Sequence, residues 1–176
     1  MTNIVLADDH HLVREGLRIL IEAETDFAVV GEASDGITAV DMVERTQPDV
    51  LIADLMMPGL TGLEVARLVS QRCPHTRVVV LSMHANEAYV LEALRNGVGA
   101  YVLKESRAND LVHAVHEVLA GRRYLSPPLT ERAIESYIEK AQTVETDSYE
   151  TLTTREREIL QLSAEGHNAA AIATRL

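Results

Sequence analysis

Short apolar runs rich in β-branched residues recur along the first two thirds of the chain. They occupy residues 4–7, 28–30, 50–53, 78–81 and 100–103, and their length and composition predict buried strands. Between the runs, apolar residues recur every three or four positions, which predicts amphipathic helices. Two such stripes are Leu12, Val13, Leu17, Leu20 and Ile21, and Leu111, Val112, Val115, Val118 and Leu119. Because parallel strands need crossover connections, five strand–helix units predict an α/β fold with a parallel sheet covered on both faces.

Local signals predict where some helices begin and end. Thr61 and Glu64 have the spacing of a capping box after the Pro58-Gly59 turn, and Asn96-Gly97 is typical of a helix stop before the fifth strand.

The pattern changes after residue 120. Pro127-Pro128 interrupts helical spacing, residues 129–141 fit a short helix, and residues 143–150 are polar, acidic and aperiodic. We therefore expect a domain over residues 1–120, a linker with a short helix over 121–151, and a partial all-α unit over 152–176. Two short helices bury too little apolar surface to fold alone, so we expect this last unit to be cut short.

Composition narrows the class of protein. Hydrophobic residues make up 47% of the 176 residues, with one Phe and no Trp, so the core is expected to be aliphatic. Cys73 is the only cysteine, which excludes an internal disulfide and fits the reducing cytoplasm. We find no signal-peptide pattern and no apolar run of membrane-spanning length, so we expect a cytoplasmic protein with no membrane partner.

The acidic charge is concentrated in the first domain. The net charge is −11, and residues 1–120 carry 9 Lys and Arg against 18 Asp and Glu. This balance argues against nucleic-acid binding by that domain and suits a divalent cation or a basic partner.

Complementary polar residues follow four of the predicted strands. They are Asp8 and Asp9, Asp54, Ser82, and Lys104. In a doubly wound sheet of strand order 2-1-3-4-5, the first and third strands are neighbours, so the three aspartates share one rim. Clustered carboxylates repel one another unless a cation is bound, and oxygen-only ligands favour Mg²⁺. Lys104 and Ser82 add an ammonium and a hydroxyl, which together suit a phosphoryl group arriving on Asp54.

This arrangement resembles the receiver domain of two-component response regulators over residues 1–120, with the flavodoxin-like (βα)5 fold. The resemblance implies that Asp54 is the phosphoacceptor and that Asp8, Asp9, Asp54 and the backbone carbonyl of Met56 hold Mg²⁺. It also implies that Lys104 pairs with the phosphate and that Ser82 and Tyr101 form a switch pair. Pro58 and Gly62, which the family favours after the acceptor, are both present.

Residues 152–176 resemble the start of a LuxR-type helix-turn-helix, with a departure at Ala169-Ala170-Ala171, where the family carries polar residues. The recognition helix would lie beyond Leu176, so we expect no DNA-binding residue within the given sequence.

The combined prediction is a NarL/FixJ-type response regulator, not an enzyme, that takes a phosphoryl group from a sensor histidine kinase. We expect phosphorylation-dependent homodimerisation, and DNA binding by the full-length protein only. One alternative is a receiver that works independently of phosphorylation. Another, an aspartate-based phosphohydrolase, would need an acid two residues after Asp54, where Met56 stands. A flavodoxin-like phosphate binder is disfavoured because Asp8 and Asp9 would repel the phosphate.

Overall fold

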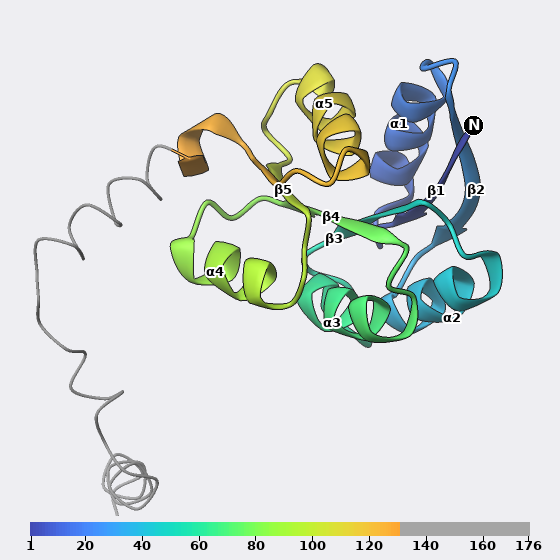
Figure 1. Ribbon diagram of the computed structural model, residues 1–176, viewed down its shortest axis with the longest axis horizontal. Helices are drawn as coiled ribbons and strands as arrows, with labels where there is room; N and C mark the ends of the chain where they lie inside the picture. The colour runs from blue at the N-terminus through green and yellow to red at the C-terminus, as the bar shows by residue number, and fades with distance from the viewer. Residues whose placement is uncertain (131–176) are drawn as a thin grey trace, which may run out of the picture. The chain divides into compact units, whose positions relative to one another are not determined.

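A computed structural model of the chain describes residues 1–130, which form one parallel sheet with helices on both faces (Figure 1). The elements are β1 (Thr2–Ala7), α1 (His11–Glu22), β2 (Phe27–Ala33), α2 (Gly36–Thr46), β3 (Val50–Asp54), α3 (Gly62–Arg72), β4 (Arg77–Ser82), α4 (Glu87–Arg95), β5 (Ala100–Leu103), α5 (Ala108–Leu119) and β6 (Tyr124–Leu125). Of the helix expected over 129–141, only residues 129 and 130 are among the described residues. The helix-turn-helix expected over 152–176 lies wholly outside them.

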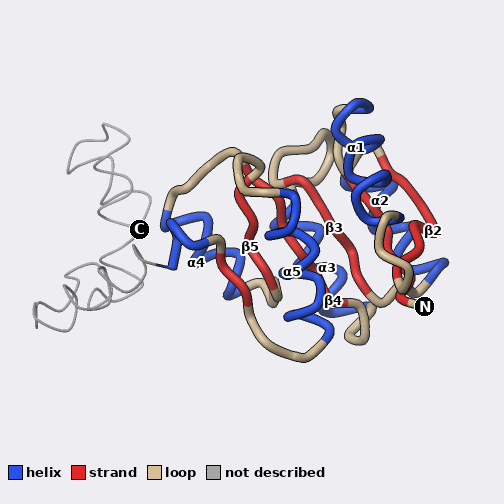
Figure 2. Tube along the Cα trace, turned by 90° about the horizontal axis from the view of Figure 1, so that it is seen from above, coloured by secondary structure: helices blue, strands red, loops and turns tan. Residues whose placement is uncertain are grey.

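The strands lie side by side in the order β2-β1-β3-β4-β5-β6, all parallel. Figure 2 labels β2, β3, β4 and β5 of this sheet. The predicted order 2-1-3-4-5 is confirmed, and β6 extends the sheet beyond β5. The pairing of β1 with β2 slips by one residue, because Ile4 pairs with Val29 and Val5 pairs with Gly31. Val30 is therefore the extra residue of a bulge at this edge of the sheet.

Alternating side chains of the central strands fill two apolar layers, one on each face of the sheet. Helices α1 and α5 cover one face, and α2, α3 and α4 cover the other (Figure 1). The strand residues under α1 and α5 are Ile4, Leu6, Val50, Ile52, Val79, Leu81, Ala100 and Val102. Those on the opposite face are Val5, Ala7, Leu51, Ala53, Val78, Val80, Tyr101 and Leu103. Both faces are buried, so the strands read as continuous apolar runs in the sequence.

The helix boundaries follow the predicted signals. Thr61 and Glu64 form a reciprocal capping box at the start of α3, with Thr61 N donating to the Glu64 carboxylate at 2.8 Å. Helix α4 ends at Arg95, and Gly97 has a φ of +84°, a left-handed conformation that favours glycine. The stripe predicted on α1 is only partly buried: Ile21 is fully buried, whereas Leu12 is 80% exposed.

The start of the predicted linker differs from the expectation, because residues 124–130 run along the edge of the sheet. Tyr124–Leu125 form β6, and Leu129 is 2% exposed. Residues 127–130 are helical, so Pro127-Pro128 opens a helical turn instead of interrupting one. Proline suits the first turn of a helix, where backbone N–H groups have no helical acceptor.

Among residues 1–130, no helix combines the length and the apolarity that crossing a lipid bilayer requires.

Gly62, the first residue of α3, lies against the backbone at the end of β3. Its N–H donates to Leu55 O at 2.8 Å, and a Cβ built on Gly62 would lie 2.3 Å from Asp54 O. The start of α3 thus lies so close to the end of β3 that only glycine fits at position 62.

We predict that Gly62→Ala lowers the free energy of unfolding by about 1–3 kcal/mol, because the new methyl group forces the backbone apart. Urea unfolding of the full chain measures this effect. Gly16→Ala in α1 is the matched control: a Cβ there meets nothing within 4 Å, so we expect a gain of about 0.5–1 kcal/mol from helix propensity. Equal stability of the two variants would contradict the assigned contact.

Candidate functional site

The carboxyl ends of four parallel strands bring the predicted site residues to one edge of the sheet. Asp8 follows β1, Asp54 and Ser82 are the last residues of β3 and β4, and Lys104 follows β5. Asp8 and Ser82 are 0% exposed and Asp54 is 5% exposed. An edge of this kind, at the point where the strand order reverses, is where open α/β sheets place their ligands.

The ammonium group of Lys104 joins two of the aspartates. Its Nζ lies 2.7 Å from Asp8 Oδ2 and 3.0 Å from Asp54 Oδ2. Burial alone would lower the pKa of Lys104, but hydrogen bonds and charge interactions with both carboxylates outweigh it and raise the pKa above its usual value. Lys104 therefore stays charged and compensates the negative charge of the cluster.

Asp54 carries an unfavourable charge in this environment. Burial raises the pKa of Asp54, the hydrogen bond and charge of Lys104 lower it, and the charge of Asp8 raises it again. A hydrogen bond from the backbone of Met56 also lowers it, and the net result is a pKa above the usual 3.8. The ionised form is thus less stable than that of an exposed aspartate, and an added cation would favour it.

The acidic rim fits a metal ion. Asp8, Asp9, His10 and Asp54 each offer one ligand atom, and these atoms all lie within 4.8 Å of one another. Asp9 is exposed, so the cluster opens to solvent on its side. Carboxylate oxygens are the donors that Mg²⁺ prefers, so the donor set fits this ion. The carbonyl of Met56 as a further ligand stays a prediction.

His10 belongs to this cluster, although sequence reasoning did not include it among the site residues. Its Nδ1 lies 2.8 Å from Asp9 Oδ1 and 3.3 Å from Asp8 Oδ1. Its backbone N–H also donates to Asp8 Oδ1 at 2.8 Å. His11, by contrast, begins α1. The two histidines could not be told apart by sequence because only the turn after β1 decides which of them faces the acids.

Arg14 is a second residue that sequence reasoning missed. It lies one turn into α1, donates to Asp8 O at 2.7 Å and pairs with Glu32 at 3.3 Å. Its side chain is 13% exposed. Arg14 therefore fixes the backbone of Asp8 against β2, and no spacing rule links Arg14 to Glu32.

Both residues of the predicted switch pair hydrogen-bond to the backbone of His84. Ser82 Oγ accepts from His84 N at 2.9 Å, and Tyr101 OH donates to His84 O at 2.9 Å. Tyr101 is 0% exposed, and burial raises its pKa above the usual value, so the hydroxyl stays protonated. The hydroxyl groups of β4 and β5 thus both hold the loop that leads into α4.

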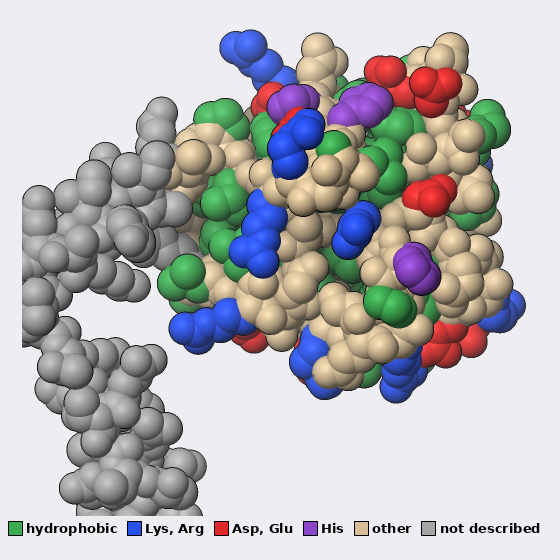
Figure 3. All heavy atoms as spheres, viewed as in Figure 1, with side chains coloured by type: hydrophobic (Ala, Val, Ile, Leu, Met, Phe, Trp, Pro, Cys, Tyr) green, Lys and Arg blue, Asp and Glu red, His purple; other side chains and the backbone are tan. Residues whose placement is uncertain are grey.

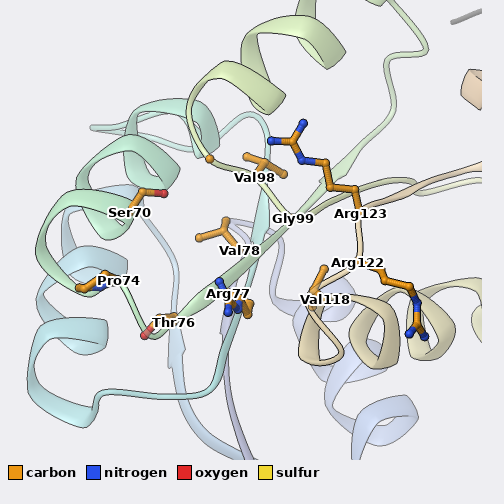
Figure 4. A pocket seen from close by; sticks show the side chains of 12 residues that line it. Ser70, Pro74, Thr76, Arg77, Val78, Val98, Gly99, Val118, Arg122 and Arg123 are labelled. Carbon is orange, nitrogen blue, oxygen red and sulfur yellow. The ribbon is translucent and has the colours of Figure 1, made fainter.

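Within residues 1–130, no second group of Asp, Glu, His or Cys side chains has the spacing to hold a metal ion. On the face seen in Figure 3, acidic, basic and apolar side chains are interspersed. A pocket of about 320 Å³ lies near the start of β4 and is lined by Arg77 and Arg123 among others (Figure 4). None of the predicted site residues lines this pocket, so it is distinct from the aspartate site.

Comparison with known proteins agrees with this geometry. The chain matches the response regulator receiver domain family over residues 4–116. It is 39% identical to the nitrate/nitrite response regulator NarL of Escherichia coli K12, over 98% of this chain and 80% of NarL. It is 38% identical to the transcriptional regulatory protein DegU of Brevibacillus brevis, over 94% of this chain and 75% of DegU.

Solved structures give the same result. A LuxR-family response regulator from Aurantimonas sp. SI85-9A1 superposes with a TM-score of 0.76 at 38% identity, covering 78% of this chain and 99% of that one. The response regulator RcsB in complex with DNA superposes with a TM-score of 0.73 at 29% identity, covering 99% of this chain and 82% of RcsB. The chain therefore belongs to the response regulator receiver domain family and is a two-component response regulator of the NarL/FixJ, LuxR-family type.

Proposed function

We propose that Asp54 accepts a phosphoryl group from a sensor histidine kinase and that this modification controls transcription through DNA binding. The observation that carries the proposal is the position of Asp54: its carboxylate lies 3.0 Å from the ammonium group of the partly buried Lys104, and its ligand oxygen lies within 4.8 Å of those of Asp8 and Asp9. This combination suits transient storage of a phosphoryl group.

In the proposed transfer, a carboxylate oxygen of Asp54 attacks the phosphorus atom and the bond from phosphorus to the donor breaks. Lys104, 3.0 Å from Asp54 Oδ2, lies close enough to pair with the new phosphoryl oxygens. Asp8, Asp9 and Asp54 would hold Mg²⁺, with the Met56 carbonyl as a further ligand. When bound, the ion neutralises the charge that gathers on the phosphoryl oxygens.

Ser82 provides a route from the site to the rest of the domain. Its hydroxyl binds the backbone of His84, so turning toward a phosphoryl group would cost the Ser82–His84 hydrogen bond. Tyr101 holds the carbonyl of the same residue. A shift of Ser82 would therefore release the loop before α4 and alter the surface near α4 and β5.

The output is proposed to be phosphorylation-dependent dimerisation and DNA binding by the full-length protein. The similarity to RcsB, solved in complex with DNA, supports DNA as the partner. A receiver that acts independently of phosphate is the second candidate, and failure of the parent to label in the first experiment below would favour it. A phosphohydrolase is disfavoured because Met56 occupies the position of the required acid.

We predict that a small phosphodonor with Mg²⁺ labels the chain once, and that Asp54→Asn abolishes the label because the nucleophile is gone. Intact-protein mass spectrometry measures the label, which should be stable in acid and lost in base. Asp41→Asn, an exposed carboxylate on α2, is the control and should label like the parent. A label that persists in Asp54→Asn would refute the acceptor assignment.

We predict that Mg²⁺ raises the melting temperature of the parent chain by linkage, and that Asp9→Ala removes this shift. Asp9 is the exposed member of the acidic pair, so its loss removes a ligand without emptying a buried position. Thermal unfolding with and without Mg²⁺ measures the effect, and Asp41→Ala should respond like the parent. An unchanged response of Asp9→Ala to Mg²⁺ would place the ion elsewhere.

We predict that Asp54→Asn raises the free energy of unfolding at neutral pH without Mg²⁺, because the neutral amide avoids the cost of burying a carboxylate charge. The pKa of Asp54 in the folded protein is raised, mainly by burial. Asp54 therefore contributes stability only while it is protonated: the contribution is full below its pKa in the unfolded chain and is lost as pH rises through its pKa in the folded protein. The gain in Asp54→Asn should therefore disappear as pH falls below 3.8, where Asp54 is neutral in both states. Urea unfolding across this range measures it, with Asp41→Asn as the control. A gain that is constant with pH would contradict the assigned cause.

A further inference from the structure

Residues 124–130, which we call the strap, run along the open edge of β5. Tyr124 N donates to Gly99 O and Ser126 N donates to Tyr101 O, both at 3.1 Å. Leu129 is 2% exposed and lies in the same apolar cluster as Tyr101 and Leu103. The strap therefore hydrogen-bonds to β5, the strand that carries Tyr101, and packs into the same apolar cluster as that strand.

The hydroxyl group of Ser126 completes this edge. Strand β6 pairs only with Ala100 and Tyr101, so Leu103 N has no strand partner on that side. Instead, Leu103 N donates to Ser126 Oγ at 3.0 Å, and the same oxygen lies 3.0 Å from Ser106 Oγ. Ser126 is 0% exposed. Without this hydroxyl, a buried backbone N–H would lose its acceptor, which is costly.

Leu103 is the residue directly before Lys104. The backbone of Lys104 is held from the other side, where its N–H donates to Ser82 O at 2.8 Å. Ser126 therefore hydrogen-bonds to β5 at Tyr101 and at Leu103. Lys104, which contacts the aspartates, directly follows this strand. The ammonium position depends on where this short strand ends.

We propose that Ser126 is a positioning residue that fixes the end of β5, and with it Lys104, so that phosphorylation and the order of the strap are coupled. This inference rests on the proposed function. The coupling is reciprocal at equilibrium: an intact strap favours the phosphorylated form, and a phosphoryl group bound by Ser82 and Lys104 stiffens the strap. An intact strap is also expected to speed phosphorylation, because it holds Lys104 in place. The strap follows α5 in the chain, so this coupling would carry the signal from the aspartate site toward the carboxyl-terminal end of residues 1–130.

The first test needs no phosphorylation. Amide hydrogen exchange of the full chain compares Ser126→Ala with Thr130→Ala, which removes a strap hydrogen bond to Leu125 O but none to β5. We expect the Leu103 amide to exchange about tenfold faster in Ser126→Ala and within about twofold of the parent in Thr130→Ala. Equal exchange rates of the Leu103 amide in both variants would overturn the proposed role of the Ser126 hydroxyl in holding Leu103 N.

The second test adds acetyl phosphate and Mg²⁺ and follows labelling of Asp54 together with exchange of the amides of residue 126 and Leu129. We expect labelling to slow these amides at least about threefold in the parent and in Thr130→Ala, but not in Ser126→Ala. We also expect Ser126→Ala to label several-fold more slowly, because Lys104 is less well held. A purely structural role for Ser126 would leave the labelling rate unchanged.

The outcomes separate the two proposals. Failure of the parent to label at Asp54 refutes the proposed function. Normal labelling of the parent with no change in the exchange of its strap amides overturns the coupling and leaves the proposed function intact. Because this measurement uses only the parent, it tests the coupling even if Ser126→Ala does not fold. A parent-like labelling rate or a parent-like strap response in Ser126→Ala also overturns the role of Ser126.

Discussion

The ion contacts of Lys104 with Asp8 and Asp54 are the constraint on which the rest of the receiver depends. Three charged groups lie in a largely buried position, and the two distances of 2.7 and 3.0 Å leave little room for adjustment. Removing the lysine would leave the two carboxylates uncompensated in this largely buried position, which costs far more than the contacts contribute. The register of β1, β3 and β5 must therefore be accurate enough to bring all three side chains together.

The surrounding structure supplies that accuracy. Gly62 allows α3 to approach the end of β3, Arg14 holds the backbone of Asp8, and Ser126 holds the end of β5. Each of these contacts acts on the backbone beside a charged residue and not on the charge itself. The charged side chains are thus positioned through backbone contacts that come from three different parts of the chain.

Much of this arrangement could be predicted from the order of residues along the chain. The buried strands read as β-branched runs, and the topology of such sheets then places Asp8, Asp54, Ser82 and Lys104 at one edge. Contacts made by chain turns and by backbone groups could not be predicted. The position of His10 depends on one turn, Ser126 binds a backbone N–H, and a two-residue strand such as β6 has no periodicity to detect.

The edges of the sheet have a consequence for the behaviour of the protein in a crowded cell. A long, regular edge strand invites strand addition by other chains and thus aggregation. Here β6 covers the edge of β5 but is only two residues long, and it runs into Pro127-Pro128, which lacks backbone N–H donors. At the opposite edge, the bulge at Val30 disrupts the regular spacing of β2. The same features that complete the receiver therefore also protect it from pairing with its neighbours.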